Sequence, residues 1–354
     1  VELMANAKIP ATVITGFLGA GKTTLIRHML SNARGKRVAL IINEFGDLGV
    51  DGDVLRGCGA EACTEDDIVE LTNGCICCTV ADDFIPTMEK LLERDQLPDH
   101  IVIETSGLAL PQPLVNAFNW PGIKTRVTVD GVVTVVDSAA VAAGRFADDH
   151  DKLDAQRSED ESLDHESPLE ELFEDQLTVS DLIILNKADL VGEEALKSIR
   201  TDISAHLKRQ PRMIEARNGE VAPEILLGLG VGTEDDIANR KSHHELEHEG
   251  EDHDHDHDEF DSFVVEFGGL ENSVDFIEGL KGIIARHDIL RLKGFADIPG
   301  KPMRLVIQAV GARVDSYFDR PWNAGETRGT RLVVIGLHDI DQDAIRAEIA
   351  GLIG

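Results

Sequence analysis

Residues 16–23 form the pattern G-x-x-x-x-G-K-T, whose residue types and spacing suit phosphate binding. Glycines let backbone N–H groups approach phosphate oxygens, and the N-terminus of a following helix adds its positive dipole end. Lys22 would reach the β- and γ-phosphates and Thr23 would bind Mg²⁺. A glycine-rich turn can match by chance, but a strand-like run before the pattern and a helical stretch after it favour nucleotide binding. The predicted nucleotide contacts are Gly16, Phe17, Leu18, Gly19, Ala20, Gly21, Lys22, Thr23 and Thr24.

A carboxylate stands at the end of another strand-like run. Glu104 follows Ile101–Ile103 and precedes Thr-Ser-Gly. An acidic side chain at such a strand tip would hold Mg²⁺, directly or through water, and Gly107 would let the backbone respond to a γ-phosphate. The alternative makes Glu104 a partner of a helix N-cap. We expect Lys22, Thr23 and Glu104 to carry the catalytic chemistry.

The segment Asn186-Lys187-Ala188-Asp189 follows a third strand-like run, Leu182–Leu185. The Asp189 carboxylate can accept two hydrogen bonds from guanine N1–H and N2–H₂, donors that adenine lacks. Asn186 would brace the loop and bond the base, while the Lys187 stem would lie along the ring. Four polar residues after a strand are also a common turn, but after a phosphate loop this motif favours GTP over ATP.

Three thiols lie within four residues in Cys75-Ile76-Cys77-Cys78. Thiolates prefer Zn²⁺, Co²⁺ or Cu⁺, whereas Mg²⁺ and Ca²⁺ prefer oxygen. The spacing is not the paired C-x-x-C of a structural zinc ribbon, so it favours an exchangeable site with Glu44 as the best candidate for a missing ligand. Buried packing cysteines are the alternative. The predicted metal ligands are Cys75, Cys77, Cys78 and Glu44 for a cargo ion, and Thr23 and Glu104 for Mg²⁺.

Two weaker metal-binding candidates lie elsewhere. Cys58 and Cys63 could be accessory ligands or a redox pair, but no histidine or further cysteine accompanies them, which favours loop residues. The run His253-Asp-His-Asp-His257 can collect metal ions loosely, although neighbouring carboxylates favour protonated histidine, which competes with metal.

The elements that must position these groups follow from the apolar pattern. Short, nearly continuous apolar runs, each followed by Gly, Asn, Asp or Glu, are typical of parallel strands buried on both faces. Helical stretches lie between them, for example residues 23–30 and 85–92. We therefore predict a doubly wound, mostly parallel α/β domain of the P-loop NTPase type. The strand-like runs are Ala11–Thr15, Val38–Ile42, Ile101–Ile103, Val132–Val136 and Leu182–Leu185.

The C-terminal part has a different pattern. Residues 260–267 alternate like a strand, residues 304–309 and 331–337 are strand-like, and a short amphipathic helix is expected near 341–353. A further helix is predicted to bury Val274, Ile277, Leu280 and Ile284 on one face. We predict a P-loop GTPase domain over 1–235, a His/Asp-rich acidic linker over 236–259, and a small α+β domain over 260–354.

Charge narrows the classes of partner. The chain of 354 residues carries 66 Asp and Glu against 34 Lys and Arg, a net charge of −32. This balance excludes nucleic acid as a main partner and disfavours an anionic membrane surface. Residues 148–175 hold 13 carboxylates and residues 234–259 hold 12, the latter with six histidines, which is typical of solvated segments. No apolar run is long enough to span a membrane, and the N-terminus lacks a signal-peptide pattern, so we expect a cytoplasmic protein.

Together, residues 16–23, 43–46, 74–78, 104–109 and 186–189 resemble the SIMIBI-class P-loop GTPases of metal homeostasis, closest to the CobW/zinc-regulated GTPase family. Residues 43–53, 80–88 and the Cys58/Cys63 loop resemble its CobW branch, which is associated with aerobic cobalamin biosynthesis. The resemblance covers nearly the whole chain and includes Glu104, where most GTPases have Asp.

The resemblance implies a slow GTPase and GTP-dependent metallochaperone using Mg²⁺, with Cys75, Cys77 and Cys78 as cargo ligands. In the CobW branch the cargo is Co²⁺, supplied to a metal-receiving protein such as a cobalt chelatase for insertion into a corrin precursor. Leu108 stands where many GTPases have a water-positioning glutamine. Three alternatives remain: a Zn²⁺ chaperone, because thiolates bind Zn²⁺ more tightly; a passive metal buffer based on the histidine-rich linker; and a P-loop small-molecule kinase, against which N-K-A-D and C-x-C-C both argue.

Overall fold

The computed structural model describes residues 8–33, 36–43, 68–71, 84–147, 169–207, 211–227, 260–311, 313–322, 326–337 and 340–353. The described residues before 228 form one compact unit, and those from 260 onward form another. The histidine-rich linker lies outside the described residues, so its limits stay a prediction.

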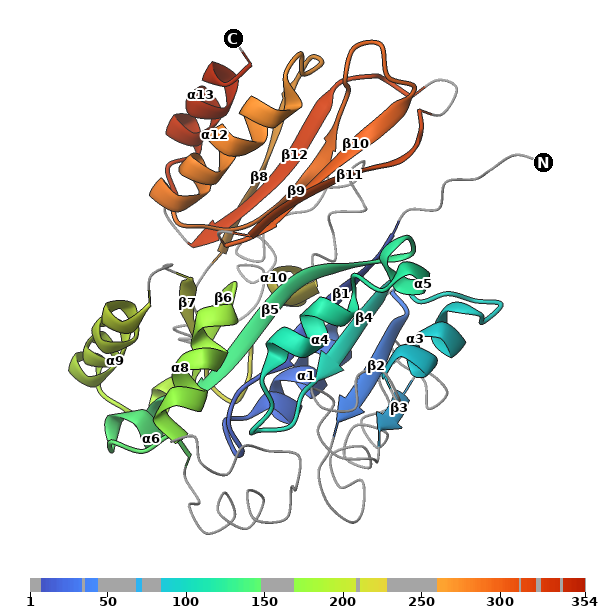
Figure 1. Ribbon diagram of the computed structural model, residues 1–354. Helices are drawn as coiled ribbons and strands as arrows, with labels where there is room; N and C mark the ends of the chain where they lie inside the picture. Colours follow the sequence, from blue (N-terminus) through green and yellow to red (C-terminus); the bar gives the residue numbers. More distant parts are fainter. Residues whose placement is uncertain are drawn as a thin grey trace, which may run out of the picture. The chain divides into compact units, whose positions relative to one another are not determined.

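The N-terminal unit is built on a seven-stranded sheet of order β3-β2-β4-β1-β5-β6-β7, in which each neighbouring pair is parallel (Figure 1). Parallel neighbours need crossover connections, which here are mostly helical. The predicted doubly wound α/β fold is therefore confirmed. The strands are β1 (Ile9–Thr15), β2 (Val38–Asn43), β3 (Ile68–Leu71), β4 (His100–Glu104), β5 (Val127–Asp137), β6 (Leu182–Asn186) and β7 (Arg212–Glu215).

Helices cover both faces of this sheet. On β1, Ala11 and Val13 point into a core shared with α3, α4 and α5. Thr12 points to the opposite face, where its hydroxyl donates to the Leu226 carbonyl of α10 at 3.0 Å. The helices are α1 (Lys22–Asn32), α3 (Ile85–Leu92), α4 (Pro111–Ala117), α5 (Pro121–Lys124), α6 (Ser138–Ala142), α8 (Leu169–Val179), α9 (Glu193–His206) and α10 (Pro223–Leu227), with the 3₁₀ turn η3 (Ala188–Leu190).

Several central strands run one residue past their apolar runs and end on a polar residue. β4 ends on Glu104, β5 on Asp137 and β6 on Asn186. In the register, Ile14 pairs with Glu104 and Asp137 pairs with Asn186. The strand ends therefore meet along the carboxyl edge of the sheet, where ligands of doubly wound folds bind.

The C-terminal unit is an antiparallel five-stranded sheet of order β11-β10-β9-β12-β8 with two helices on one face (Figure 1). Phe263 and Val265 of β8 pack in one core with Leu280 of α12 and Ile345 of α13. This arrangement confirms the predicted α+β class. The elements are β8 (Phe260–Phe267), α12 (Ser273–Arg286), β9 (Ile289–Ala296), β10 (Met303–Val310), β11 (Arg313–Pro321), β12 (Thr330–Leu337) and α13 (Gln342–Gly351).

The predicted buried face of α12 is wrong at its first residue. Val274 is 69% exposed, whereas Phe276, Leu280, Ile283 and Ile284 are buried. Phe276 is the largest apolar side chain of the helix and occupies the core. At about 100° per residue, this places Val274 on the opposite side of the helix.

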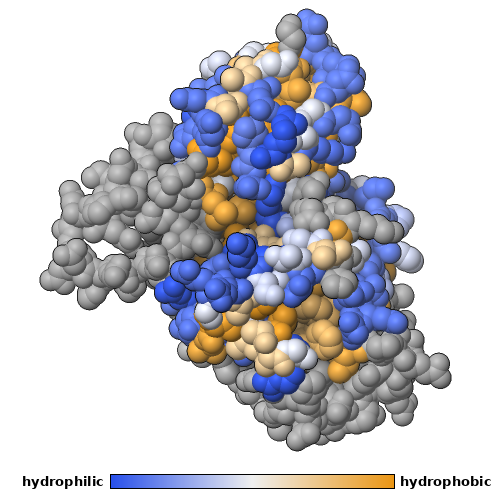
Figure 2. Space-filling model, turned by 90° about the vertical axis from the view of Figure 1, so that its left-hand side faces the viewer, coloured by the Kyte–Doolittle hydropathy of each residue, from blue (hydrophilic) through white to orange (hydrophobic). Residues whose placement is uncertain are grey.

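One face of the molecule, seen in Figure 2, has hydrophilic residues over much of its described surface, with smaller apolar patches between them. Among the described residues, no helix is long and apolar enough to cross a membrane.

Candidate nucleotide site

The loop between β1 and α1 has a backbone that only glycine readily adopts. Gly16, Gly19 and Gly21 have φ angles of 134°, 77° and 99°. A Cβ on Gly16 would lie 2.2 Å from the Val135 carbonyl oxygen, and a Cβ on Gly21 would lie 2.3 Å from Asn186 Nδ2. Steric space and backbone angle thus both require glycine at the first and last of these positions.

Lys22 folds back over this loop. Its Nζ donates to the carbonyl oxygens of Gly16 at 2.7 Å and Phe17 at 3.3 Å, and the residue is only 7% exposed. The ammonium group therefore lies inside the loop that would surround a phosphate chain. Positive φ angles together with a buried ammonium group make this loop chemically suited to an anion.

The side chains of Phe17 and Leu18 have a structural role. Phe17 is 2% exposed, and its ring centroid lies 6.1 Å from Phe146 and 5.8 Å from Phe173. Leu18 and Leu108 belong to the same apolar cluster. Their side chains anchor the loop, so any contact of these two residues with phosphate would come from the backbone.

Two hard oxygen donors meet beside the loop. The Thr23 hydroxyl, at the start of α1, donates to Glu104 Oε1 at 3.1 Å, and Glu104 is 3% exposed. β1 and β4 are neighbours, which brings residues 81 positions apart into contact. Carboxylate and hydroxyl oxygens are donors that Mg²⁺ prefers, so the pair fits this ion.

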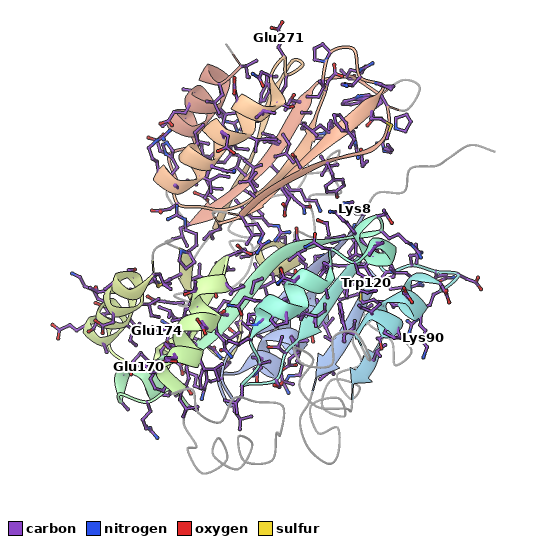
Figure 3. All side chains as sticks on the ribbon, viewed as in Figure 1. Lys8, Lys90, Trp120, Glu170, Glu174 and Glu271 are labelled. Atoms are coloured by element: carbon purple, nitrogen blue, oxygen red, sulfur yellow. The ribbon has the colours of Figure 1, made fainter. Side chains whose placement is uncertain are left out.

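The loop after Glu104 is held by a residue that the sequence analysis did not identify. Gln176 of α8 is fully buried, and its Nε2 donates to the carbonyl oxygens of Gly107 and Ala109, both at 3.1 Å. Figure 3 labels Glu170 and Glu174 on the same helix, where Glu170 is exposed and Glu174 half-buried. A Cβ on Gly107 would lie 2.7 Å from the Leu18 nitrogen, so this loop also lies against the phosphate loop.

Asn186 connects three segments at the far side of the site. Its Nδ2 donates to the Ala20 carbonyl at 2.9 Å, and its Oδ1 accepts from the Gly219 N–H at 3.0 Å. These two hydrogen bonds are consistent with the predicted role of Asn186 in bracing the loop. Asp189 is exposed, and within the described residues its carboxylate forms no hydrogen bond or ion pair. A carboxylate in that state can accept hydrogen bonds from a ligand.

The loop after β7 was also missed by the sequence analysis. Asn218 and Gly219 have φ angles of 51° and 71°, and a Cβ on Gly219 would lie 2.6 Å from the Leu25 nitrogen. The loop therefore packs closely on the start of α1. The Asn-Gly dipeptide after a short β-prone run was the available signal, because it favours positive φ angles.

The predicted cargo ligands lie outside the described residues: Glu44, Cys75, Cys77 and Cys78, together with Cys58, Cys63 and the histidine run of the linker. In the part of the chain that the structure describes, no group of three or more His, Cys, Asp or Glu side chains could hold a metal ion.

Comparison with known proteins agrees with this site. Residues 10–215 match the family described as CobW/HypB/UreG, nucleotide-binding domain, and residues 260–353 match the Cobalamin synthesis protein cobW C-terminal domain. A protein from Sinorhizobium sp named Zinc chaperone CobW is 75% identical over 348 residues, 98% of each chain. A protein of the same name from Pseudomonas aeruginosa is 54% identical over 347 residues, 97% of this chain and 91% of the relative.

A crystal structure described as Zn(II)-bound YjiA GTPase from E. coli is 24% identical, with 98% of this chain and 99% of that chain covered and a TM-score of 0.37. The two matched domains span most of the chain, and the Sinorhizobium relative covers nearly all of it. The chain therefore belongs to the CobW/HypB/UreG family of P-loop GTPases and carries the C-terminal domain of its CobW members.

Proposed function

We propose that this P-loop GTPase is a GTP-dependent metallochaperone whose cargo is Zn²⁺. The assignment of Zn²⁺ as the cargo rests on one observation, that relatives 75% and 54% identical over nearly the whole chain are both named zinc chaperones. This observation favours Zn²⁺ over Co²⁺, the cargo that the sequence analysis placed first. Delivery of Co²⁺ for cobalamin biosynthesis stays a prediction.

The nucleotide half of the proposal assigns a role to each part of the site. The backbone of residues 16–24 and the Lys22 ammonium would bind the phosphates of GTP. Asp189 would accept hydrogen bonds from guanine N1–H and N2–H₂, and Asn186 would hold the loop that presents it. The bonds from Asn186 to Ala20 and Gly219 support this assignment, because they link the base side of the site to the phosphate side.

Thr23 and Glu104 would hold Mg²⁺, and their 3.1 Å contact supports this assignment. The ion would neutralise negative charge on the β- and γ-phosphates. Lys22 would stabilise the charge that develops during hydrolysis, while Gln176 would keep the Gly107 loop in place. Leu108 is buried in the apolar cluster and cannot orient water, which supports slow hydrolysis.

Cargo binding is assigned to Cys75, Cys77 and Cys78, with Glu44 as a further ligand. GTP would close the 43–53 segment over the thiolates and raise the affinity for Zn²⁺, and hydrolysis would lower it again. The receiving partner would be a metal-requiring protein, and the reducing cytoplasm would keep the thiols available as ligands. The net charge of −32 favours a basic patch on that partner.

A competition titration tests the proposal directly. Zn²⁺ is titrated into the full chain against a chromophoric chelator, with Mg²⁺ and either a nonhydrolysable GTP analogue or GDP. We expect the Zn²⁺ affinity to be about tenfold or more higher with the GTP analogue, a coupling of about 1.4 kcal/mol or more. Equal affinities with the two nucleotides would rule out gating by GTP.

Two cysteine variants identify the binding site. Cys77→Ser is expected to lose the high-affinity Zn²⁺ site, while the matched Cys58→Ser is expected to keep it. The same titration with Co²⁺ compares the two cargo ions. A higher affinity for Co²⁺ than for Zn²⁺ under the GTP condition would restore the cobalt hypothesis.

A further inference from the structure

We propose that Asp137 is a positioning residue for guanine recognition, which acts by holding Lys187. The inference rests on the proposed GTP site. Lys187 Nζ lies 2.6 Å from Asp137 Oδ2, and the two side chains are 26% and 1% exposed. A short ion pair with one partner almost completely buried is held far more firmly than a pair on the open surface.

The two oxygens of Asp137 have separate tasks. Oδ1 accepts the N–H groups of Ala139 and Ala140, both at 3.0 Å, and so caps the start of α6. Oδ2 remains for Lys187. Because the cap fixes one oxygen, the carboxylate cannot rotate away from the lysine. Asp137 also pairs with Asn186 in the β5–β6 register, so it lies beside residues 186–189, the loop proposed to bind guanine.

The backbone of Lys187 is fixed as well. It has φ 58° and ψ 32°, a left-handed conformation that a lysine rarely adopts. On one side of it, Asn186 is tied to Ala20 and Gly219. On the other side, the Ala188 N–H donates to the Ala216 carbonyl at 3.1 Å. Strained residues of this kind persist where the surroundings determine them, typically at ligand sites.

The lysine is therefore held at both ends, by its backbone and by its ammonium group. Its aliphatic stem between these points is ordered before a ligand arrives, next to Asn186 and near Asp189. A side chain ordered in advance loses less rotamer freedom when a base packs against it. The effect belongs to the base and not to the phosphates, so Asp137 should favour GTP and GDP equally.

The test variant is Asp137→Asn. Asparagine still caps a helix, but its amide nitrogen would face the Lys187 ammonium, and both groups are hydrogen-bond donors. With Mg²⁺ present, we expect the Kd for GTP and for GDP to rise by a similar factor of about five to ten. The KM for GTP should rise with them, whereas kcat at saturating GTP should not fall. Unchanged Kd values would show that Asp137 only caps α6 and would overturn the proposal.

Two further variants separate positioning from general damage. Asp341→Asn makes the same change at another N-cap, where Asp341 accepts the Ala344 N–H of α13, and it should leave nucleotide affinity unchanged. Lys187→Met removes the partner, so adding Asp137→Asn to it should cost no further affinity. An equal additional loss in that background would also overturn the proposal. If the unmodified chain bound no GTP, the proposed function itself would fail, independently of Asp137.

Discussion

At the residue scale, buried and half-buried polar side chains hold the candidate site together through hydrogen bonds within and between its loops. Asn186 is 2% exposed and joins the loop after β6 to both the phosphate loop and the loop after β7. Lys22 bridges two carbonyls of one loop, and Thr23 reaches Glu104. Each contact satisfies a buried polar group, so we expect its loss to lower both the stability of the fold and the affinity for a ligand.

Asn186→Asp tests this bridging role. The carboxylate could still accept the Gly219 N–H, but it would repel the Ala20 carbonyl and lose one hydrogen bond. We expect a destabilisation of about 1–3 kcal/mol and weaker GTP binding, measured by thermal unfolding and nucleotide titration. The matched Asn32→Asp, at an exposed side chain that bonds the His28 carbonyl, should change both values little. Unaltered stability and affinity in the Asn186 variant would show that the hydrogen bonds of Asn186 do not hold the site together.

At the element scale, α8 holds the loop after β4 through side-chain hydrogen bonds. Gln176 reaches this loop through two hydrogen bonds, and Phe173 of the same helix packs on Phe17 of the phosphate loop. The helix thus contacts both loops that would surround the phosphates.

Gln176→Met keeps much of the side-chain volume and removes both donors. Two buried carbonyls would lose this partner, so we expect a lower unfolding temperature and a fall in the GTP hydrolysis rate larger than the loss of GDP affinity. The matched Gln342→Met, on α13 of the other unit, should leave hydrolysis unchanged. Equal losses for hydrolysis and GDP affinity would indicate a general distortion instead of a loop effect.

In the C-terminal unit, α12 and α13 are joined by a charged contact. The Glu348 carboxylate bonds to Arg286 and, at 2.9 Å, to His287 Nε2. The hydrogen bond from Arg286, and then that from His287, lowers the pKa of Glu348 below its ordinary value of 4.5. A lowered pKa in the folded state means that this contact stabilises the protein above pH 4.5 and that the contribution is lost as the pH falls through the lowered value.

Glu348→Gln should therefore unfold at a lower temperature than the unmodified chain near neutral pH, and the difference should disappear under acidic conditions. Calorimetry of the two proteins over a pH series measures it. The matched Glu278→Gln, whose carboxylate pairs with Lys281 on the exposed side of α12, should show a smaller difference near neutral pH. A Glu348→Gln difference that stays constant into acid would contradict the assignment.

At the scale of the whole molecule, the charge is concentrated in two segments. Residues 148–175 and 234–259 together account for −21 of the net −32. Most residues of these segments lie outside the described part of the chain. An acidic chain raises the local concentration of cations, which suits every metal-handling hypothesis and does not by itself choose between a chaperone and a buffer.

Deleting residues 243–258 makes that choice. The deletion removes all six histidines of the linker while leaving the thiol cluster intact. We expect the highest-affinity Zn²⁺ site to survive with one ion per chain and its response to GTP to persist, while weaker binding is lost. Loss of the highest-affinity site would make the passive buffer the leading hypothesis. Deleting residues 148–168, which removes a net charge of −7 against −8 for residues 243–258, controls for lost negative charge.

The sequence alone determined the class of the fold and the positions of the main motifs. The glycine spacing of residues 16–23, the apolar runs and the Gly, Asn, Asp or Glu after each run are local patterns, and local sterics and burial decide them. Thus α3 and β8 have the predicted bounds, and the parallel sheet is confirmed. On α12, Phe276 is buried and Val274 is 69% exposed, so the sequence prediction for Val274 was wrong.

Which distant side chains meet could not be predicted from the sequence and is seen only in the folded chain. Asn186 bonds a carbonyl 166 residues away, Gln176 one 69 residues away, and Asp137 lies 50 residues before Lys187. Such partners depend on the order of the strands and on register, which long-range packing fixes and no local pattern contains. A polar residue at the end of a strand indicates a binding site, but only the assembled edge of the sheet shows which side chains form that site together.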